Sequence, residues 1–212
     1  KWILSQFNNL TKEVTENLEK FELGIAVQKL YDFIWDIFCD WYIELAKARF
    51  NEKETEANLI CQNVIAYVLN GTLKLLHPFM PFITEEIYSG LPGEDGTIML
   101  KDYPEADKIP SFADESASFE RVISAIKAIR ARRAEMGVVP SRKAAVNVVT
   151  KYADSFEGKG VFFERLASAA SFAIVDSYED EGAVQIITDS AAIYIPLADM
   201  VDFKAEAERL EK

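Results

Sequence analysis

The sequence predicts a mainly α-helical protein: an antiparallel helical bundle, then a small α+β module and the start of a C-terminal helix. Two patterns support this fold class, namely apolar residues at helical spacing in the first half and alternating, strand-like segments in the second. Half of the 212 residues are hydrophobic and 12% are aromatic, which suffices to build folded cores. We expect the bundle over residues 1–113, the module over 114–202 and the terminal helix over 203–212.

The bundle begins with an amphipathic helix. Its apolar residues recur at alternating spacings of three and four, which places them on one face. They are Ile3, Phe7, Leu10, Val14, Leu18 and Phe21. Glu22, Leu23 and Gly24 break the pattern, so the first helix is expected to end there.

A second helix is apolar around more than half of its circumference, as a central helix of a bundle would be. Its core-facing side chains form an aromatic-rich seam: Ala26, Leu30, Phe33, Ile34, Ile37, Phe38, Trp41 and Leu45. Asp40 and Glu44 form an i, i+4 pair on another side. This pair is expected to hold Lys47 or Arg49, or a backbone N–H of a neighbouring segment.

A third helix follows a polar turn or helix start at residues 51–58. Its apolar residues are Leu59, Val64, Val68, Leu69, Leu73 and Leu76. His77 and Pro78 end it, because a residue before proline disfavours the α conformation. Pro81 can occupy the first turn of a short fourth helix through Tyr88. The side chains expected to plug the end of the bundle are Phe79, Met80, Phe82 and Ile83.

Proline and glycine mark the passage between the two predicted domains. Residues 90–96 are expected to form a loop, and residues 97–100 a short extended piece across the bundle. Residues 101–114, with Pro104 and Pro110, are expected to form the linker.

The second domain opens with a long helix at about residues 115–136. Gly137 supplies its stop signal, and Pro140 supports the same end. The remaining elements are a strand at 144–150, a helix at 161–170, a strand at 172–175 and a hairpin of 184–187 with 191–195.

Motifs for catalysis are nearly absent. The single histidine, His77, precedes a proline and lacks partners for a triad or a metal site, so a structural or surface role is expected. Gly158, Lys159 and Gly160 are too short a run for a phosphate loop. We therefore expect no catalytic residue, no metal site and no cofactor within this chain.

The two cysteines, Cys39 and Cys61, lie in apolar helical patterns without C-x-x-C spacing. Buried free thiols in a reducing cytoplasm are expected. No apolar run approaches membrane-spanning length and no signal peptide is visible, so no membrane association is expected. Both ends read as helix, and the chain is expected to be a piece of a longer polypeptide.

The strongest functional signal is a local reversal of charge. The chain has a formal net charge of −12, but residues 121–143 hold seven Lys or Arg and one acid, Glu135, which leaves about +6 (seven minus one). An acidic protein that gathers positive charge in one place usually presents it to an anionic partner.

The placement of these charges suggests how they are used. Phe119, Ile123 and Ile126 form a helical stripe that Arg130 and Arg133 continue. The last turns of the helix are therefore expected to leave the core and meet a partner. The alternative is that arginines near a helix C-terminus complement its dipole and are solvated.

Three segments, in order along the chain, resemble the valyl-tRNA synthetase family in its C-terminal region. They are residues 38–44 (FCDWYIE), 76–86 (LHPFMPFITEE) and 133–138 (RAEMGV), the last followed by Pro140. The middle segment is shared more loosely with the related isoleucyl, leucyl and methionyl enzymes, whereas the other two favour the valyl family. Tyr88 stands where Trp is frequent, a conservative departure.

The resemblance implies an anticodon-binding helical bundle over residues 1–113, the α+β module, and the beginning of a coiled-coil arm at 203–212. Most of that arm and the first bundle helix would lie outside this chain. The family's Rossmann-type catalytic domain, with H-I-G-H and K-M-S-K-S signatures, and its editing domain have no counterpart here. Ligase chemistry with ATP and Mg would therefore belong to the rest of the parent enzyme, and this fragment would be no enzyme.

The expected partners are valine tRNA and the catalytic domain of the same polypeptide, with a monomeric state. The predicted tRNA-backbone contacts are Lys127, Arg130, Arg133, Arg142 and Lys143. Arg132, which projects away from the stripe, is a further candidate, and Lys47 and Arg49 are candidates near the end of the second helix. The rival hypothesis is a protein-interaction module, in which the arginine stripe docks on an acidic surface of the parent enzyme without touching RNA.

Overall fold

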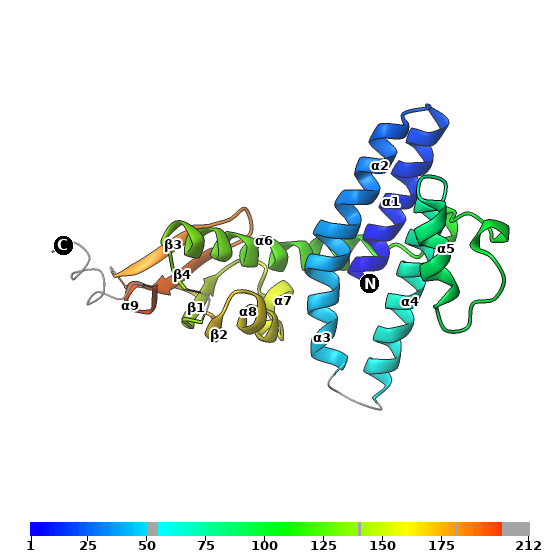
Figure 1. Cartoon of the computed structure of the whole chain (residues 1–212). Helices are drawn as coiled ribbons and strands as arrows, with labels where there is room; N and C mark the ends of the chain where they lie inside the picture. Colours follow the sequence, from blue (N-terminus) through cyan, green and yellow to red (C-terminus); the bar gives the residue numbers. More distant parts are fainter. Residues whose placement is uncertain (51–54, 140, 181, 201–212) are drawn as a thin grey trace, which may run out of the picture. The chain divides into compact units, whose positions relative to one another are not determined.

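The computed structural model describes residues 1–50, 55–139, 141–180 and 182–200, with only the backbone described at 48 and 49. The chain divides into two compact units, Lys1–Ser116 (unit 1) and Ala117–Lys212 (unit 2). Unit 1 is helical, and unit 2 combines helices with a four-stranded sheet (Figure 1). The predicted fold class, a helical bundle followed by an α+β module, is confirmed.

Unit 1 begins with α1 (Trp2–Glu19), whose predicted apolar face is buried as far as Val14. The helix ends earlier than predicted. Phe21 takes a left-handed conformation (φ 59°), while its N–H donates to Leu18 O at 3.0 Å and the N–H of Glu22 donates to Asn17 O at 2.8 Å. This is a Schellman ending. It turns Phe21 into solvent, 87% exposed, so the prediction that Phe21 belongs to the core is wrong.

A second, unbroken helical run follows in three parts: α2 (Leu23–Asp32), a π-helical stretch η1 (Phe33–Ile43) and α3 (Glu44–Phe50). The predicted aromatic seam is present, because Phe33, Phe38 and Trp41 are buried and the rings of Phe33 and Phe38 stack at 6.4 Å. The wider π turns were not predicted, since periodicity over eleven residues does not separate them from α turns.

The third predicted helix is α4 (Glu56–Leu76), and Thr55 caps it by accepting a hydrogen bond from the N–H of Asn58 at 3.2 Å. Residues 51–54 of the predicted turn lie outside the described residues. Leu59 is exposed rather than in the core. By length and composition α4 could cross a membrane, contrary to the sequence analysis. In unit 1 it packs beside α1, α3 and α5, and 28% of its apolar window is buried.

Helix α5 (Pro81–Ser89) starts at a proline, as predicted. Its buried side chains are Thr84 and Tyr88, one turn apart. Because these two residues face inward, Phe82 and Ile83 point outward, and Phe82 is 90% exposed. The prediction that these residues and Met80 plug the end of the bundle is therefore wrong.

The segment after α5 packs onto unit 1. The predicted extended piece is instead a 3₁₀ turn, η2 (Ile98–Leu100), whose Ile98 is buried with Leu73 and Tyr88. A second 3₁₀ turn, η3 (Ala106–Lys108), follows within the predicted linker. Its ends are held from α1, because the Asn8 amide donates to the carbonyls of Ala106 and Ile109, each at 2.7 Å.

Unit 2 contains α6 (Ala113–Glu135) from Ala117 onward. Gly137, at φ 64°, ends the helix as predicted. Its N–H donates to Ala134 O at 3.0 Å, and the N–H of Val138 donates to Arg133 O at 2.9 Å, a second Schellman ending. Pro140 lies outside the described residues.

The sheet of unit 2 has the order β2-β1-β4-β3. Its strands are β1 (Ala144–Val149), β2 (Ala169–Ile174), β3 (Ala183–Ile187) and β4 (Ala192–Pro196). β1 and β2 are parallel, whereas β4 is antiparallel to both β1 and β3. The predicted hairpin is confirmed, because Ile187 pairs with Ala192 and the N–H of Thr188 donates to Ala191 O at 2.9 Å.

The described part of unit 2 also contains three short helices, α7 (Ala153–Phe156), α8 (Gly160–Leu166) and α9 (Leu197–Met200). The helix predicted over 161–170 ends at Leu166 because β2 begins three residues later. The core combines α6, the sheet and α7–α8, and its fully buried side chains include Val122, Ile126, Ile129, Val148, Phe156, Phe163, Ile193 and Ile195. The helix predicted at 203–212 lies outside the described residues.

Candidate nucleic-acid interface

Helix α6 presents three of the predicted cations to solvent, Lys127, Arg130 and Arg132. Lys127 and Arg130 are exposed and three residues apart, so their side chains are neighbours on the helix surface. The exposed residues beside them, Ser124 and Ala131, have small side chains. This face of α6 therefore carries positive charge and has small neighbouring side chains, so an elongated anion can approach it.

Arg133 is in a different position. Its side chain is only 6% exposed, four residues after the fully buried Ile129 on the same face of α6. Its guanidinium donates to the carbonyl of Val139 at 3.4 Å and to the carbonyl of Arg142. Burial lowers the pKa of this guanidinium. Its stem extends the apolar stripe while its guanidinium bonds the turn after α6. The phosphate contact at Arg133 stays a prediction, and this burial argues against it.

Arg142 is half-buried and lies two residues before β1. Its Nε donates to Asp199 O at 2.8 Å and its Nη2 to Ala198 O at 3.0 Å, which ties β1 to α9. The next residue, Lys143, is exposed. Arg142 is therefore anchored within unit 2, and Lys143 projects from the anchored backbone.

Arg132 is exposed and pairs with Glu135 at 3.2 Å, one turn along α6. Exposed ion pairs of this kind contribute between nothing and about 1 kcal/mol, so an incoming phosphate can compete for Arg132. The carboxylate of Glu135 reduces the local positive field at Arg132.

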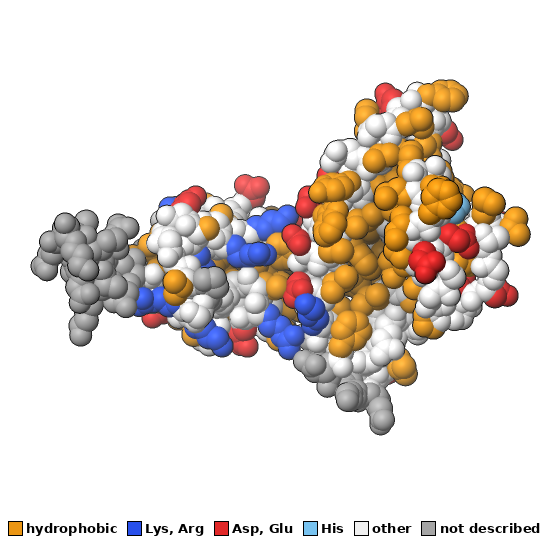
Figure 2. Space-filling model, in the orientation of Figure 1, with side chains coloured by type: hydrophobic (Ala, Val, Ile, Leu, Met, Phe, Trp, Pro, Cys, Tyr) orange, Lys and Arg blue, Asp and Glu red, His pale blue; other side chains and the backbone are white. Residues whose placement is uncertain are grey.

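A cation–aromatic group on unit 2 escaped the sequence analysis. The guanidinium of Arg121 lies over the ring of Tyr152, 4.1 Å from its centroid, and donates to Ser155 Oγ at 3.1 Å. Lys151 Nζ lies 5.1 Å from the same centroid. Arg121 was counted in the charged run, but no local pattern links it to an aromatic ring thirty-one residues later. Figure 2 shows Lys and Arg side chains gathered on the visible face of unit 2.

The two predicted cations of unit 1 are only partly described. Lys47 is exposed on α3 and forms an ion pair with Glu44, as the sequence analysis proposed. The side chain of Arg49 lies outside the described residues. Unit 1 is otherwise rich in exposed apolar side chains (Figure 2), among them Phe82, Leu100 and Met99.

The described residues hold no candidate site for a metal ion. No group of three His, Cys, Asp or Glu side chains is placed to bind a metal within those residues. Gly158 lies at φ 68° between α7 and α8, and the loop is too short to cradle phosphates. A hydrogen bond of 2.7 Å links His77 Nδ1 with Thr84 Oγ1 and joins the end of α4 to α5.

Comparison with known proteins decides the family. A model of the anticodon-binding domain of tRNA ligases matches residues 1–149. The chain belongs to this family. It is 47% identical over 212 residues to the valine–tRNA ligase of Clostridium tetani, 46% identical over 217 residues to that of Clostridium acetobutylicum, and 36% identical over 216 residues to that of Listeria innocua. These alignments cover 99–100% of this chain and 24% of each relative, so the chain spans about a quarter of the length of the relatives.

Proposed function

We propose that this chain is the tRNA-recognition part of a valine–tRNA ligase and that unit 2 grips the sugar–phosphate backbone of valine tRNA. The observation that carries the proposal is the exposed pair Lys127 and Arg130 on α6, with Lys143 nearby in the sequence, in a chain whose net charge is −12. Overall charge repels RNA, so binding must depend on such a local patch.

The chemistry of this patch is neutralisation of phosphate. Lysine and arginine side chains set the position of a nucleic acid without reading its sequence. Each phosphate contact contributes about −0.7 to the slope of log K against log salt for single strands. The ring of Tyr152 and the guanidinium of Arg121 could receive an unstacked base beside this patch, because both offer planar surfaces. Lys47 and Arg49 remain candidates for contacts made by unit 1.

A second role is favoured by the exposed apolar side chains of unit 1. Side chains such as Phe82 and Leu100, which are 90% and 83% exposed, suit a protein surface better than RNA. We assign this surface to docking against the catalytic part of a longer ligase polypeptide. Docking by unit 1 and RNA binding by unit 2 are compatible, whereas docking by the cations of unit 2 is the rival hypothesis.

We propose that the ATP and Mg²⁺ of the parent enzyme bind other parts of the ligase. A monomeric chain in the cytoplasm accords with the proposed function.

The direct test is a filter-binding assay of the 212-residue chain with valine tRNA at low salt. Replacement of Lys127 and Arg130 by Ala should weaken binding severalfold. Replacement of Lys12 and Lys20 by Ala, two exposed lysines of unit 1, removes the same charge and should weaken binding much less. Equal losses in the two variants, or no binding by the unchanged chain, would refute the proposal.

A further inference from the structure

The sheet of unit 2 has an unprotected edge at β3. In the strand order β2-β1-β4-β3, the two edges are β2 and β3 (Figure 1). The register of β1 with β2 shifts between Ala144 and Ala145, and an irregularity of this kind disrupts a ladder. β3 pairs with β4 in continuous register from Ala183 to Ile187. Its sequence, AVQII, contains none of the lysines or prolines that usually protect an edge, so a further strand can pair with it.

Alternate residues of β3 direct their backbone groups away from β4. The N–H of Thr188 donates to Ala191 O at 2.9 Å, which sets the phase of the ladder. Hydrogen-bonded and non-hydrogen-bonded pairs alternate along an antiparallel ladder. The N–H and C=O groups of Gln185 and Ile187 therefore point away from β4, toward a side on which the described residues place no further strand.

The side chains beside this edge are uncharged. Gln185 and Ile187 lie on the same face of the strand, and Ile187 is 74% exposed. Gln185 Nε2 donates to the hydroxyl of Tyr194 at 3.0 Å, and the ring of Tyr194 stacks on that of Tyr178 with centroids 5.1 Å apart. Side chains directly opposite each other on neighbouring strands pack together. An added strand would therefore place an apolar side chain beside Ile187.

The part of the sequence that contains β3 is strongly acidic. Residues 166–200 contain six Asp or Glu and no Lys or Arg. Asp180 precedes β3, Asp189 follows it in the hairpin turn, and both are exposed. Carboxylates at the two ends of the strand attract Lys or Arg of a partner. The charge therefore favours a basic segment at this edge.

The same charges argue against two other occupants. Carboxylates repel a phosphate backbone, so RNA is disfavoured at this edge. A second copy of this chain, paired antiparallel through β3, would bring Asp180 of one copy near Asp189 of the other. Like charges opposite each other destabilise a pair of strands. A basic extended segment has neither disadvantage.

We propose that β3 is a docking edge for an extended segment of another polypeptide chain, in which alternating apolar residues are flanked by Lys or Arg. The segment adds a strand to the sheet and bonds the backbone groups of Gln185 and Ile187. Its cations lie beside Asp180 and Asp189. When a strand is added to an edge, main-chain hydrogen bonds give affinity and alternate side chains give specificity. The proposal does not depend on RNA binding, because it uses none of the cations proposed to contact RNA.

The test is a nuclear magnetic resonance titration of the ¹⁵N-labelled 212-residue chain with the peptides KKVTVTVKK, EEVTVTVEE and KKGSGSGKK. The first peptide should shift the backbone amide signals of Gln185 and Ile187 and slow their hydrogen exchange severalfold. The second should bind on the order of tenfold more weakly, because like charges then face each other. The third carries the cations on a poor strand former and should leave both signals unmoved. Unmoved signals with the first peptide, or equal effects of the first peptide and either control, would overturn the proposal.

Variants locate the contact on β3. Gln185→Pro should abolish binding of KKVTVTVKK, because it removes an N–H that points away from β4 and leaves the existing ladder in place. Gln185→Val keeps that N–H and should bind like the unchanged chain. The double variant Asp180→Asn/Asp189→Asn should bind the peptide severalfold more weakly, while Asn retains an acceptor for the N–H of Gly182. It keeps the test decisive if Gln185→Pro fails to fold, and full affinity in either variant would contradict the proposal.

Two other results would show a different occupant and would also overturn the proposal. The unchanged chain could self-associate in analytical ultracentrifugation while Gln185→Pro does not, which would assign β3 to a second copy of the chain. Valine tRNA could shift the amide signals of Gln185 and Ile187, which would assign β3 to RNA. We expect neither result.

Discussion

Arg133 and Arg142 are joined by a hydrogen bond, in which the guanidinium of Arg133 donates to the backbone carbonyl of Arg142. Arg142 in turn donates to the carbonyls of Ala198 and Asp199. Two arginines from the cationic run thus fasten α6, β1 and α9 together. Their neighbours Lys127, Arg130 and Lys143 are exposed, and the proposed contacts with RNA rest on these three.

Replacement of Arg133 by Met should destabilise unit 2 by about 1–3 kcal/mol, because two partly buried carbonyls would lose their donor while the apolar stem is kept. Urea unfolding followed by circular dichroism measures the change. Arg132→Met is the matched control, with an expected change below about 1 kcal/mol because Arg132 is exposed and only surface-paired. Equal effects at the two positions would refute the structural role of Arg133.

Replacement by glycine should change the free energy of unfolding in opposite directions at two exposed phenylalanines. Phe21→Gly should raise the free energy of unfolding by about 0.5–1 kcal/mol, because glycine adopts the left-handed conformation of this position without strain. Phe82→Gly should lower it by about 1 kcal/mol, because Phe82 is in α5 and glycine is a poor helix former. Thermal unfolding of both variants decides the matter, and a loss of stability in Phe21→Gly would contradict the Schellman ending.

Replacement by alanine should change stability in opposite directions at two glycines that lie in helices. Gly71→Ala should destabilise unit 1 by about 1–3 kcal/mol, because the new Cβ would lie 2.2 Å from the buried Phe7 ring. Gly24→Ala meets nothing within 4 Å and should stabilise by up to about 1 kcal/mol through helix propensity. The check is the denaturant midpoint of each variant. If both midpoints lie above, or both below, that of the unchanged chain, the close contact at Gly71 is contradicted.

The burial of Tyr103 in unit 1 predicts that the free energy of unfolding depends on pH. Burial raises the pKa of Tyr103 from 10.0 to about 12. Because the folded pKa exceeds the unfolded value, the stability that Tyr103 contributes is complete below pH 10 and is lost as the pH rises through about 12. Absorbance of tyrosinate should show a late-titrating group that disappears in Tyr103→Phe. If that variant titrates like the unchanged chain, Tyr103 is not the buried group.

Local patterns predicted most elements but not every ending. The stripe of α1 and the stop at Gly137 were readable because helical period and a glycine in the left-handed conformation are local signals. Phe21 was misassigned because its spacing continues the stripe, although the chain leaves the helix before it. Phe82 was misassigned because which face of a nine-residue helix is buried depends on its neighbours in space.

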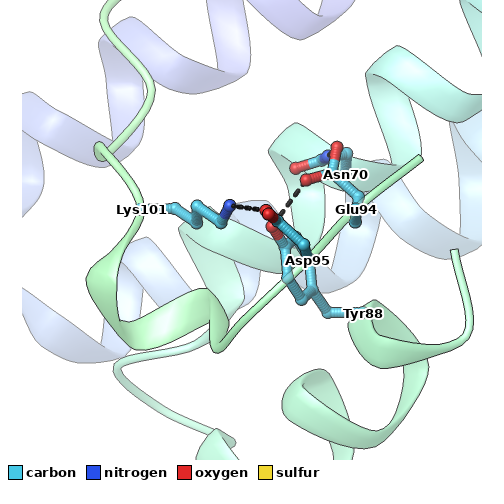
Figure 3. Close-up of polar contacts among 5 residues, drawn as sticks. All are labelled: Asn70, Tyr88, Glu94, Asp95 and Lys101. Carbon is cyan, nitrogen blue, oxygen red and sulfur yellow. Dashed lines mark hydrogen bonds and ion pairs between the residues drawn. The ribbon is translucent and has the colours of Figure 1, made fainter.

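The candidate site shows the same division. The charge reversal in the sequence located the positive run. Its pattern did not distinguish the buried Arg133, which follows Ile129 on the apolar stripe, from the exposed Lys127 and Arg130. The contact of Arg121 with Tyr152 joins distant parts of the chain. Among the described residues, Asn70 Oδ1 is buried without a hydrogen-bond partner, while Asn70 Nδ2 donates to Glu94 Oε1 (Figure 3). This depends on packing in space, so no sequence pattern predicts it.

The most direct test of the central claim is the salt dependence of valine tRNA binding. In Lys127→Ala/Arg130→Ala/Lys143→Ala the slope of log K against log salt should become shallower by about 2, since each phosphate contact contributes about 0.7. Arg133→Met should keep the slope of the unchanged chain wherever it stays folded. An unchanged slope in the triple variant, or an equal flattening in Arg133→Met, would contradict the assignment of RNA binding to the exposed cations of unit 2.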